Sequence, residues 1–379
     1  MRQKLAHIIK RYTWIQFFYR VFVSLFFRIV GCFVGSDPKL ILLSSMSGDY
    51  YDGSPRVLYE TMRTDPMFQS YRYVWAFSQP EKFSPEGAEK VKIDSFVYFV
   101  TALRAKIWIT DVNIERGLRF KKKHTIYLNT WHGTGPKKIG NAVKGRKDYD
   151  FSHVDIICVD GQYFANEMLY WFNARKESFL WCGRPREDAL LTFTEEDRQR
   201  VRQKLKIPEG KKAILYMPTW REYPIAPLYD ALWERELGED CIVFVRFHHF
   251  TKRELLTGED GFWRDVSDYP NVNELYLAAD ILVSDYSSAF FDYGLLGKPM
   301  VCFAYDYEQY CQVTGLHMDI RGEFPDGLKY TDEQVVDYIR TMDYEKASRE
   351  SKAYCDRYVR HTGSAADACI ARLKELLTK

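Results

Sequence analysis

The sequence predicts an α/β protein made of two units, each a parallel sheet with helices on both faces. Its 379 residues exceed what one typical core supports, which favours two domains. Short apolar runs alternate with helical stretches along the chain, and a second series of such runs begins after a proline and glycine turn at 207–210. A hydrophobic fraction of 46% excludes a disordered chain.

Residues 1–36 interleave large apolar residues with basic ones and contain no acidic residue. Gln16, Arg20 and Arg28 interrupt the roughly 20 apolar residues that a spanning helix needs, and no signal-peptide cleavage pattern is clear. The pattern favours an amphipathic helix at an anionic membrane surface. An ordinary helix packed on the protein and a true membrane span are the alternatives.

In the first unit, strands are expected at 40–45, 73–77, 107–110, 125–128 and 155–159. A helix should start at Ser54 and Pro55, a capping residue followed by a proline in the first turn. A charged helix should start at Thr194 and end near 207. We therefore divide the chain into a membrane-associating segment 1–36, a first domain 37–207 and a second domain 208–379.

The second unit should contain strands at 213–217, 241–245, 281–283 and 300–303. Ligands of parallel sheets bind at the carboxyl ends of the strands, and two such units would face each other across a cleft. The motifs described next all follow a predicted strand, where this rule places a site.

The first motif, 131–140, follows the strand at 125–128 and reads WHGTGPKKIG. It matches neither a dinucleotide fingerprint nor a P-loop. It does place His132 at a strand end, where an imidazole can accept a proton from an attacking alcohol. Gly133 and its neighbours would let the backbone approach an anion. A structural histidine is the alternative.

Two motifs of the second unit place cations at strand ends. Pro218-Thr219-Trp220-Arg221 follows its first strand, and Thr219 and Arg221 could bind a phosphate. In Arg246-Phe247-His248, residue alternation puts the arginine and the imidazole on one face, which suits a pyrophosphate. Solvated turns and strand edges are the alternatives.

The fourth motif runs from Asp285 to Asp292 and includes Ser287 and Ser288, where a strand should meet a helix. Unpaired amides and hydroxyl groups at a helix start can bind phosphate, although simple serine capping explains the same residues. Arg186, in the segment Cys182-Gly183-Arg184-Pro185-Arg186, could reach the same cleft or lie in a solvated turn.

The composition excludes several other classes of protein. A net charge of +2 argues against a nucleic-acid-coating protein. The eight cysteines form no C-x-x-C pair, and no His, Cys, Asp or Glu cluster has metal-ligand spacing. We therefore expect free thiols and no tightly bound metal, and the sequence is compatible with a magnesium ion that arrives with a phosphate donor.

Together the motifs resemble the CDP-glycerol glycerophosphotransferase family, the teichoic-acid primases and polymerases of Gram-positive cell walls. The family order W-H-G-T, G-x-P-R, P-T-W-R, R-x-H and D-Y-S-S-x-x-x-D is matched at 131–134, 183–186, 218–221, 246–248 and 285–292. The resemblance covers roughly residues 40–310. It implies a GT-B fold, in which two Rossmann-like domains face a cleft. By this resemblance 37–207 is the acceptor-side domain and 208–379 is the donor-binding domain.

The resemblance also implies roles for single residues. His132 looks like the catalytic base and His248 like a second essential histidine. The donor-contacting positions, with Gly133 and Arg221 added from the chemistry of their motifs, are Gly133, Thr134, Arg186, Pro218, Thr219, Arg221, Arg246, Ser287, Ser288 and Asp292. Gly135 and Pro136 depart from the family's usual proline and leucine, which bears on the acceptor or the polyol.

By this resemblance the chain transfers glycerol phosphate, or a related polyol phosphate, from a CDP-linked donor to a hydroxyl of a lipid-linked saccharide acceptor, with release of CMP. It would act as a peripheral protein on the cytoplasmic face of the cell membrane, and a homo-oligomer is compatible with the sequence. Priming and polymerising activities stay open, as do glycerol and ribitol. The alternatives are a GT-B glycosyltransferase that uses a nucleotide sugar and a non-catalytic membrane-bound scaffold.

Overall fold

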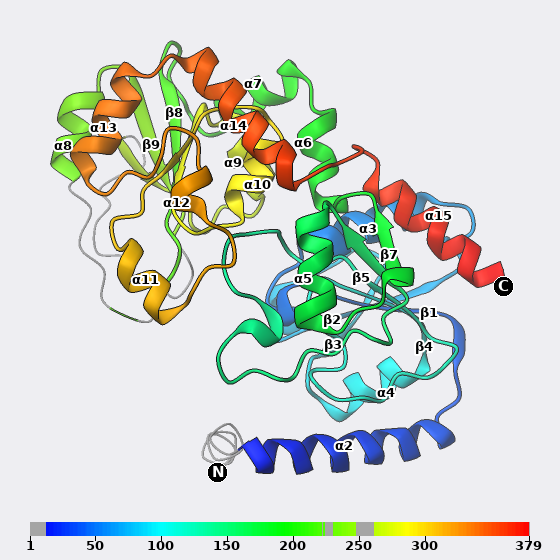
Figure 1. Ribbon diagram of the computed structural model, residues 1–379. Coiled ribbons are helices and arrows are strands. Elements are labelled where there is room, and N and C mark those ends of the chain that lie inside the picture. The colour runs from blue at the N-terminus through cyan, green and yellow to red at the C-terminus, as the bar shows by residue number, and fades with distance from the viewer. Residues whose placement is uncertain (1–12, 222, 224–229, 248–260, 379) are drawn as a thin grey trace.

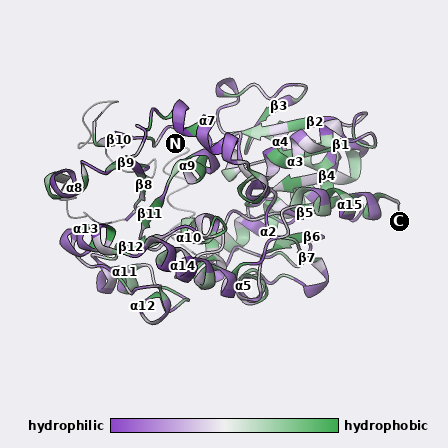
Figure 2. Cartoon of the chain, turned by 90° about the horizontal axis from the view of Figure 1, so that it is seen from above, coloured by the Kyte–Doolittle hydropathy of each residue, from purple (hydrophilic) through white to green (hydrophobic). Residues whose placement is uncertain are grey.

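The computed structural model describes residues 13–221, 223, 230–247 and 261–378. The chain forms two separate parallel sheets with helices packed around each (Figure 1). The predicted α/β class with two sheets is confirmed. Seen from above, the two groups of strands lie side by side, and many strand segments carry apolar residues (Figure 2).

The first sheet has seven parallel strands in the order β3-β2-β1-β4-β5-β6-β7. Its strands are β1 (Asp37–Ser44), β2 (Arg72–Phe77), β3 (Glu89–Lys92), β4 (Ala105–Thr110), β5 (Ile126–Asn129), β6 (Ile156–Val159) and β7 (Phe179–Trp181). The central strands are apolar on both faces because helices cover both sides of the sheet. The helices of this domain include α2 (Thr13–Phe33), α3 (Gly53–Thr64), α4 (Phe96–Arg104) and α5 (Gln162–Phe172).

The second sheet has five parallel strands in the order β10-β9-β8-β11-β12. They are β8 (Lys212–Met217), β9 (Cys241–Val245), β10 (Trp263–Asp265), β11 (Ile281–Ser284) and β12 (Met300–Cys302). The remaining helices are α6 (Asp188–Thr192), α7 (Glu195–Lys204), α8 (Asp230–Leu237), α9 (Val272–Ala278), α10 (Ala289–Gly294), α11 (Tyr307–Val313), α12 (Ile320–Glu323), α13 (Asp332–Thr341), α14 (Tyr344–Tyr358) and α15 (Ala365–Thr378).

The division between the domains differs from the predicted boundary at 207. Helix α7 packs on the second domain, where Arg198 and Arg202 both form ion pairs with Asp280. The carboxyl-terminal helix α15 instead returns to the first domain (Figure 1), where Cys369 and Ile370 join the core beside α3. The range 208–379 therefore does not form one domain, because the buried face of α15 is apolar and belongs to the first sheet.

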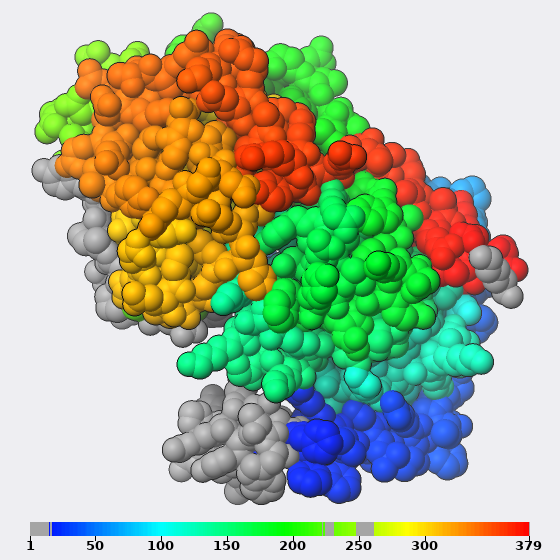
Figure 3. All heavy atoms as spheres, in the orientation of Figure 1, coloured from blue at the N-terminus to red at the C-terminus, as the bar shows by residue number. Residues whose placement is uncertain are grey.

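One side of helix α2 packs against the first domain, at the bottom of the molecule in Figure 3. Phe27 is buried against the rings of Phe99 and Phe120, and Arg28 Nε donates a 2.8 Å hydrogen bond to the carbonyl of Arg119. The helix is thus part of the first domain rather than a separate segment. Among the described residues, no helix combines the length and apolar character needed to cross a bilayer.

Candidate active site

The two sheets meet through loops that leave the carboxyl ends of their strands. The loop after β5 reaches the second domain, where Pro136 O accepts a 2.8 Å hydrogen bond from His317 N and Lys137 forms a β-bridge with Leu316. The sequence motif at 131–140 therefore forms a contact between domains. This places His132 beside the start of α10.

Gly133 brings the loop closest to the second domain. Its φ is +151°, and a Cβ atom there would lie 2.9 Å from Ser288 Cβ. A side chain at this position would push the loop away from Ser288. The backbone next to His132 can therefore touch the start of α10 only because residue 133 is a glycine.

The His132 imidazole is half-buried and held in one orientation. Its Nδ1 lies 2.9 Å from the carbonyl oxygen of Asp111, and its ring lies against that of Trp131 with the centroids 4.3 Å apart. A carbonyl can only accept a hydrogen bond, so Nδ1 carries the proton and Nε2 keeps its lone pair. Among the described residues, Nε2 has no hydrogen-bond partner, so it is available to a substrate.

Burial, together with the nearby guanidinium groups of Arg186 and Arg184, lowers the pKa of His132 to about 4. The imidazole is therefore neutral, and competent as a base, at all pH values well above 4.

For a reaction in which His132 is the base, we expect kcat/KM to keep its plateau through pH 6 and to fall only near pH 4 to 5, because protonation of His132 removes the base and its pKa is depressed. Turnover measured across pH in a buffer series of constant ionic strength checks this. A half-maximal rate close to pH 6.5, the ordinary value for histidine, would show that the imidazole is solvated rather than held as described.

Arg186 and Asp292 form an ion pair that joins the domains. Arg186 lies in a short 3₁₀ turn, Pro185–Glu187, and its Nη2 donates a 2.7 Å hydrogen bond to Asp292 Oδ1 in α10. The same nitrogen lies 3.4 Å from the carbonyl oxygen of His132. Two predicted donor-contacting residues thus contact each other, directly behind the backbone of His132.

Thr134 is buried and faces away from this contact. Its hydroxyl donates to Asp160 Oδ2 at 2.8 Å and accepts from Arg184 Nη2 at 2.7 Å. The side chain therefore anchors the loop to the first domain, and the predicted donor contact of Thr134 stays a prediction. Neither Asp160 nor Arg184 was a predicted site residue, because nothing in their spacing marks a buried partner of Thr134.

Arg221 is also buried, within the second domain. Its guanidinium donates 2.8 Å hydrogen bonds to both carboxylate oxygens of Asp306 and a 2.6 Å hydrogen bond to Asp285. Asp285 also accepts a 3.0 Å hydrogen bond from Thr219 N. The Thr219 hydroxyl donates to Asp285 as well. In this structure Arg221 and Thr219 therefore make internal hydrogen bonds, which fix the loops after β8 and β11, in place of the predicted phosphate contacts.

Other predicted donor residues line the carboxyl ends of the second sheet. Arg246, after β9, donates a 2.6 Å hydrogen bond to Tyr269 O and has no ion-pair partner among the described residues. Ser287 Oγ accepts from Ala289 N at 3.1 Å, as a capping serine does, while Ser288 lies against Gly133. Pro218 precedes Thr219 in the loop after β8. His248 lies outside the described residues.

Lys137 is a further cation at this contact. Its ammonium group makes no hydrogen bond or ion pair among the described residues, burial lowers its pKa, and Asp285 is the acid that raises it most. Lys137 belongs to the motif at 131–140, but the sequence did not single it out as a site residue. Only the fold shows that it lies at the second domain.

The match to a known family agrees with this geometry. Residues 25–373 match the model of the CDP-glycerol:poly(glycerophosphate) glycerophosphotransferase family. The chain belongs to this family. The predicted resemblance is confirmed over a longer stretch than the motifs alone covered.

Individual relatives show the same similarity. The chain is 31% identical over 351 residues to the teichoic acid poly(glycerol phosphate) polymerase of Staphylococcus epidermidis, covering 85% of this chain and 48% of that protein. It is 30% identical over 356 residues to the teichoic acid glycerol-phosphate transferase of Staphylococcus aureus, covering 81% and 88%. The chain therefore spans about half the length of the first relative and most of the second.

Among solved structures, a variant of the wall teichoic acid polymerase TagF superposes with a TM-score of 0.83 at 28% identity, covering 94% of this chain and 93% of that one. A UDP complex of S. aureus MnaA shares the fold at 12% identity with a TM-score of 0.58. These similarities support the GT-B arrangement of two parallel α/β domains.

Proposed function

We propose that this chain transfers glycerol phosphate, or a related polyol phosphate, from CDP-glycerol to a hydroxyl group of a lipid-linked acceptor and releases CMP. The observation that carries the proposal is the position of His132, an imidazole with an available Nε2 held at the contact with α10. Family membership and a TagF structure soaked with CDPG support the donor.

In the proposed reaction the acceptor hydroxyl approaches Nε2 of His132. The imidazole takes the hydroxyl proton as the acceptor oxygen bonds to the distal phosphorus of the donor. The bond from that phosphorus to the bridging oxygen breaks, and CMP leaves with the electron pair. Positioning and charge stabilisation supply most of the acceleration in such transfers.

Cations around the contact would stabilise the donor's phosphates. Arg246 and Lys137 lack ionic partners among the described residues, and Ser287 and Ser288 add hydroxyl groups. Arg186 keeps Asp292 neutralised, which would limit its repulsion of an anionic donor. The roles of His248 beside the leaving phosphate and of a magnesium ion that arrives with the donor stay predictions.

The surface of α2 supports a membrane-bound acceptor. Phe18, Phe22 and Phe26 recur on its exposed side, each more than half exposed. The exposed Phe96 and Val97 begin α4, which packs on α2. Large exposed aromatic patches mark interaction sites, and an amphipathic helix of this kind lies in the bilayer interface. We propose that this face binds the cytoplasmic surface of the membrane.

Replacing Phe18, Phe22 and Phe26 together with serine should weaken binding to phosphatidylglycerol vesicles about 100-fold, since each ring contributes roughly 1 kcal/mol or more when it leaves water. Vesicle co-sedimentation measures this. The matched control replaces three apolar residues exposed elsewhere, Tyr170, Trp181 and Val313, with serine. Equal binding of both variants would mean that the membrane contact lies outside α2.

The activity itself is tested by incubating the full chain with vesicles that carry a synthetic lipid-linked disaccharide and with CDP-glycerol, CDP-ribitol or UDP-sugars in separate reactions. We expect CMP release with a CDP-polyol, together with an acceptor whose mass grows by polyol-phosphate units. UDP release would instead identify a glycosyltransferase, and the absence of any nucleotide product would favour the scaffold.

A further inference from the structure

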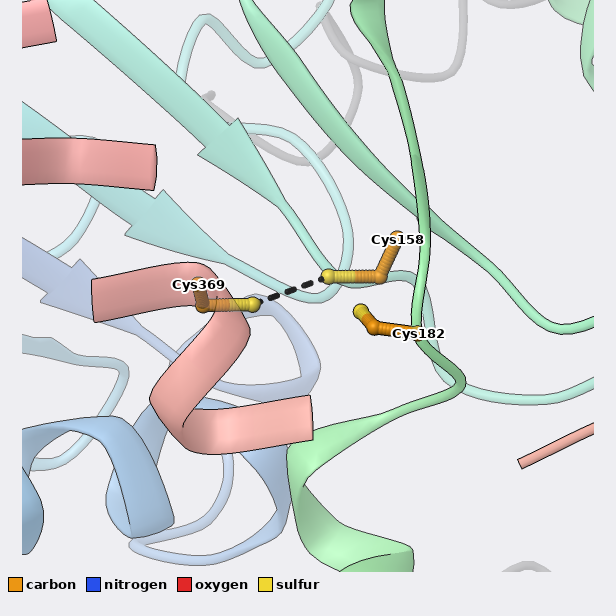
Figure 4. Close-up of side chains that lie close together, drawn as sticks. All are labelled: Cys158, Cys182 and Cys369. Atoms are coloured by element: carbon orange, nitrogen blue, oxygen red, sulfur yellow. Dashed lines mark hydrogen bonds between the residues drawn. The ribbon is translucent and has the colours of Figure 1, made fainter. Parts of the chain in front are cut away.

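Three cysteines from distant parts of the chain converge in the core of the first domain (Figure 4). Cys158 lies in β6, Cys182 directly follows β7, and Cys369 lies in α15. Their Sγ atoms all lie within 4.8 Å of one another. Cys158 and Cys369 are 211 residues apart in sequence, so no spacing motif marks the group. The sequence-based expectation of no metal cluster rested on spacing alone.

The sulfur positions match the size of a thiolate metal site. A metal–sulfur bond is about 2.3 Å long, so a cation at the centre of three thiolates holds its sulfurs about 4 Å apart. The Sγ atoms of Cys158 and Cys369 are 3.3 Å apart. Binding of a cation would therefore lengthen this distance by less than about 1 Å. Figure 4 shows the three side chains pointing toward a common centre.

The surroundings of the sulfurs select the kind of cation. An all-sulfur ligand set favours soft ions such as Cu⁺ and Zn²⁺ over Mg²⁺ or Ca²⁺. All three side chains are buried, so water does not compete for the ion. Each of the three thiols can offer one sulfur ligand. A cation would displace their protons.

We propose that Cys158, Cys182 and Cys369 form a binding site for one soft, thiophilic d¹⁰ cation of the Cu⁺ or Zn²⁺ class. The ion joins β6, the chain after β7 and the carboxyl-terminal helix α15. Two residues beyond Cys158 and Cys182 lie Asp160 and Arg184, whose side chains hold Thr134. A bound ion would therefore stabilise the segments that carry Asp160 and Arg184, which hold the His132 loop, and would take no part in the transfer reaction.

The test uses the full chain, purified anaerobically under reducing conditions, with the exposed Cys32 replaced by serine in every protein. Titration with Cd²⁺ alone should give one equivalent bound per chain, a thiolate-to-cadmium charge-transfer band and a raised Tm. A ¹¹³Cd NMR resonance typical of three-thiolate coordination should appear in the protein with all three cysteines. A parallel titration with Cu⁺, and the metal content as purified, distinguish the two ions.

Cys182→Ala and Cys369→Ala should each abolish the charge-transfer band and the gain in Tm. Cys241→Ala, at a buried thiol in β9 of the second domain, should keep both. The proposal is overturned if Cd²⁺ leaves the parent spectrum and Tm unchanged, or if the two cluster variants bind as the parent does. A disulfide between Cys158 and Cys369 in the reduced, purified protein would also overturn it. The ¹¹³Cd signal decides the matter even if the variants fail to fold.

Discussion

His132→Ala should lower kcat about 10²–10⁴-fold, which is the usual contribution of a general base, and leave the affinity for CDP-glycerol within a few-fold of the parent. The imidazole contacts Asp111 and Trp131 but makes no hydrogen bond to the second domain. Its removal therefore takes away the proton acceptor and not a donor contact. Single-turnover CMP release measures the rate, and calorimetry with CDP-glycerol measures the affinity.

The control for this variant is His124→Ala. His124 is exposed and precedes β5, at the opposite end of the strand from His132, so its loss should leave kcat unchanged. Near-normal turnover of folded His132→Ala would exclude the imidazole as the base. Loss of donor affinity in step with kcat would instead make His132 a binding residue.

Arg221→Met should lower the free energy of unfolding by about 3–5 kcal/mol, the usual cost of removing one partner from a buried ion-pair network. The guanidinium lies between Asp285 and Asp306, and without it two buried carboxylates face each other. Burial alone would lower the pKa of Arg221, but the hydrogen bond to Asp306 and the charges of Asp285 and Asp306 outweigh it and raise that pKa above its ordinary value. Urea unfolding followed by circular dichroism measures the change.

The matched control is Arg321→Met, because Arg321 pairs with Glu308 at the exposed surface, where ion pairs contribute about 0–1 kcal/mol. If Arg221→Met were as stable as the parent and lost only donor affinity, Arg221 would be a phosphate ligand, as its motif first indicated, and the internal network described here would be wrong.

Local patterns predicted much of this fold. The apolar runs located nine of the twelve described strands and missed the short edge strands β3, β7 and β10. The helix starts at Ser54 and Thr194 lie within a residue of α3 and α7. The return of α15 to the first domain was not predicted, because an amphipathic helix does not reveal which sheet buries its apolar face. The position of α7 in the second domain, before the predicted boundary at 207, was missed for a similar reason. The ion-pair partner of its Arg198 and Arg202 is Asp280, which lies far along the chain.

The candidate site was predicted by position more than by role. The motifs placed His132, Gly133 and Ser288 at strand ends, and the structure brings them together. Residue type alone could not show that Thr134 and Arg221 are hydrogen-bonded to internal partners, because the sequence does not distinguish a buried threonine or arginine from an exposed one. Asp111 offers only its backbone carbonyl to His132, which any residue could provide.

The most direct test of the central claim is the structure of the His132→Ala protein with CDP-glycerol bound. The diphosphate should lie at the start of α10 beside Ser288, with its distal phosphorus facing the position that the His132 ring vacates. A nucleotide bound with its phosphates away from both residue 132 and α10 would contradict the account.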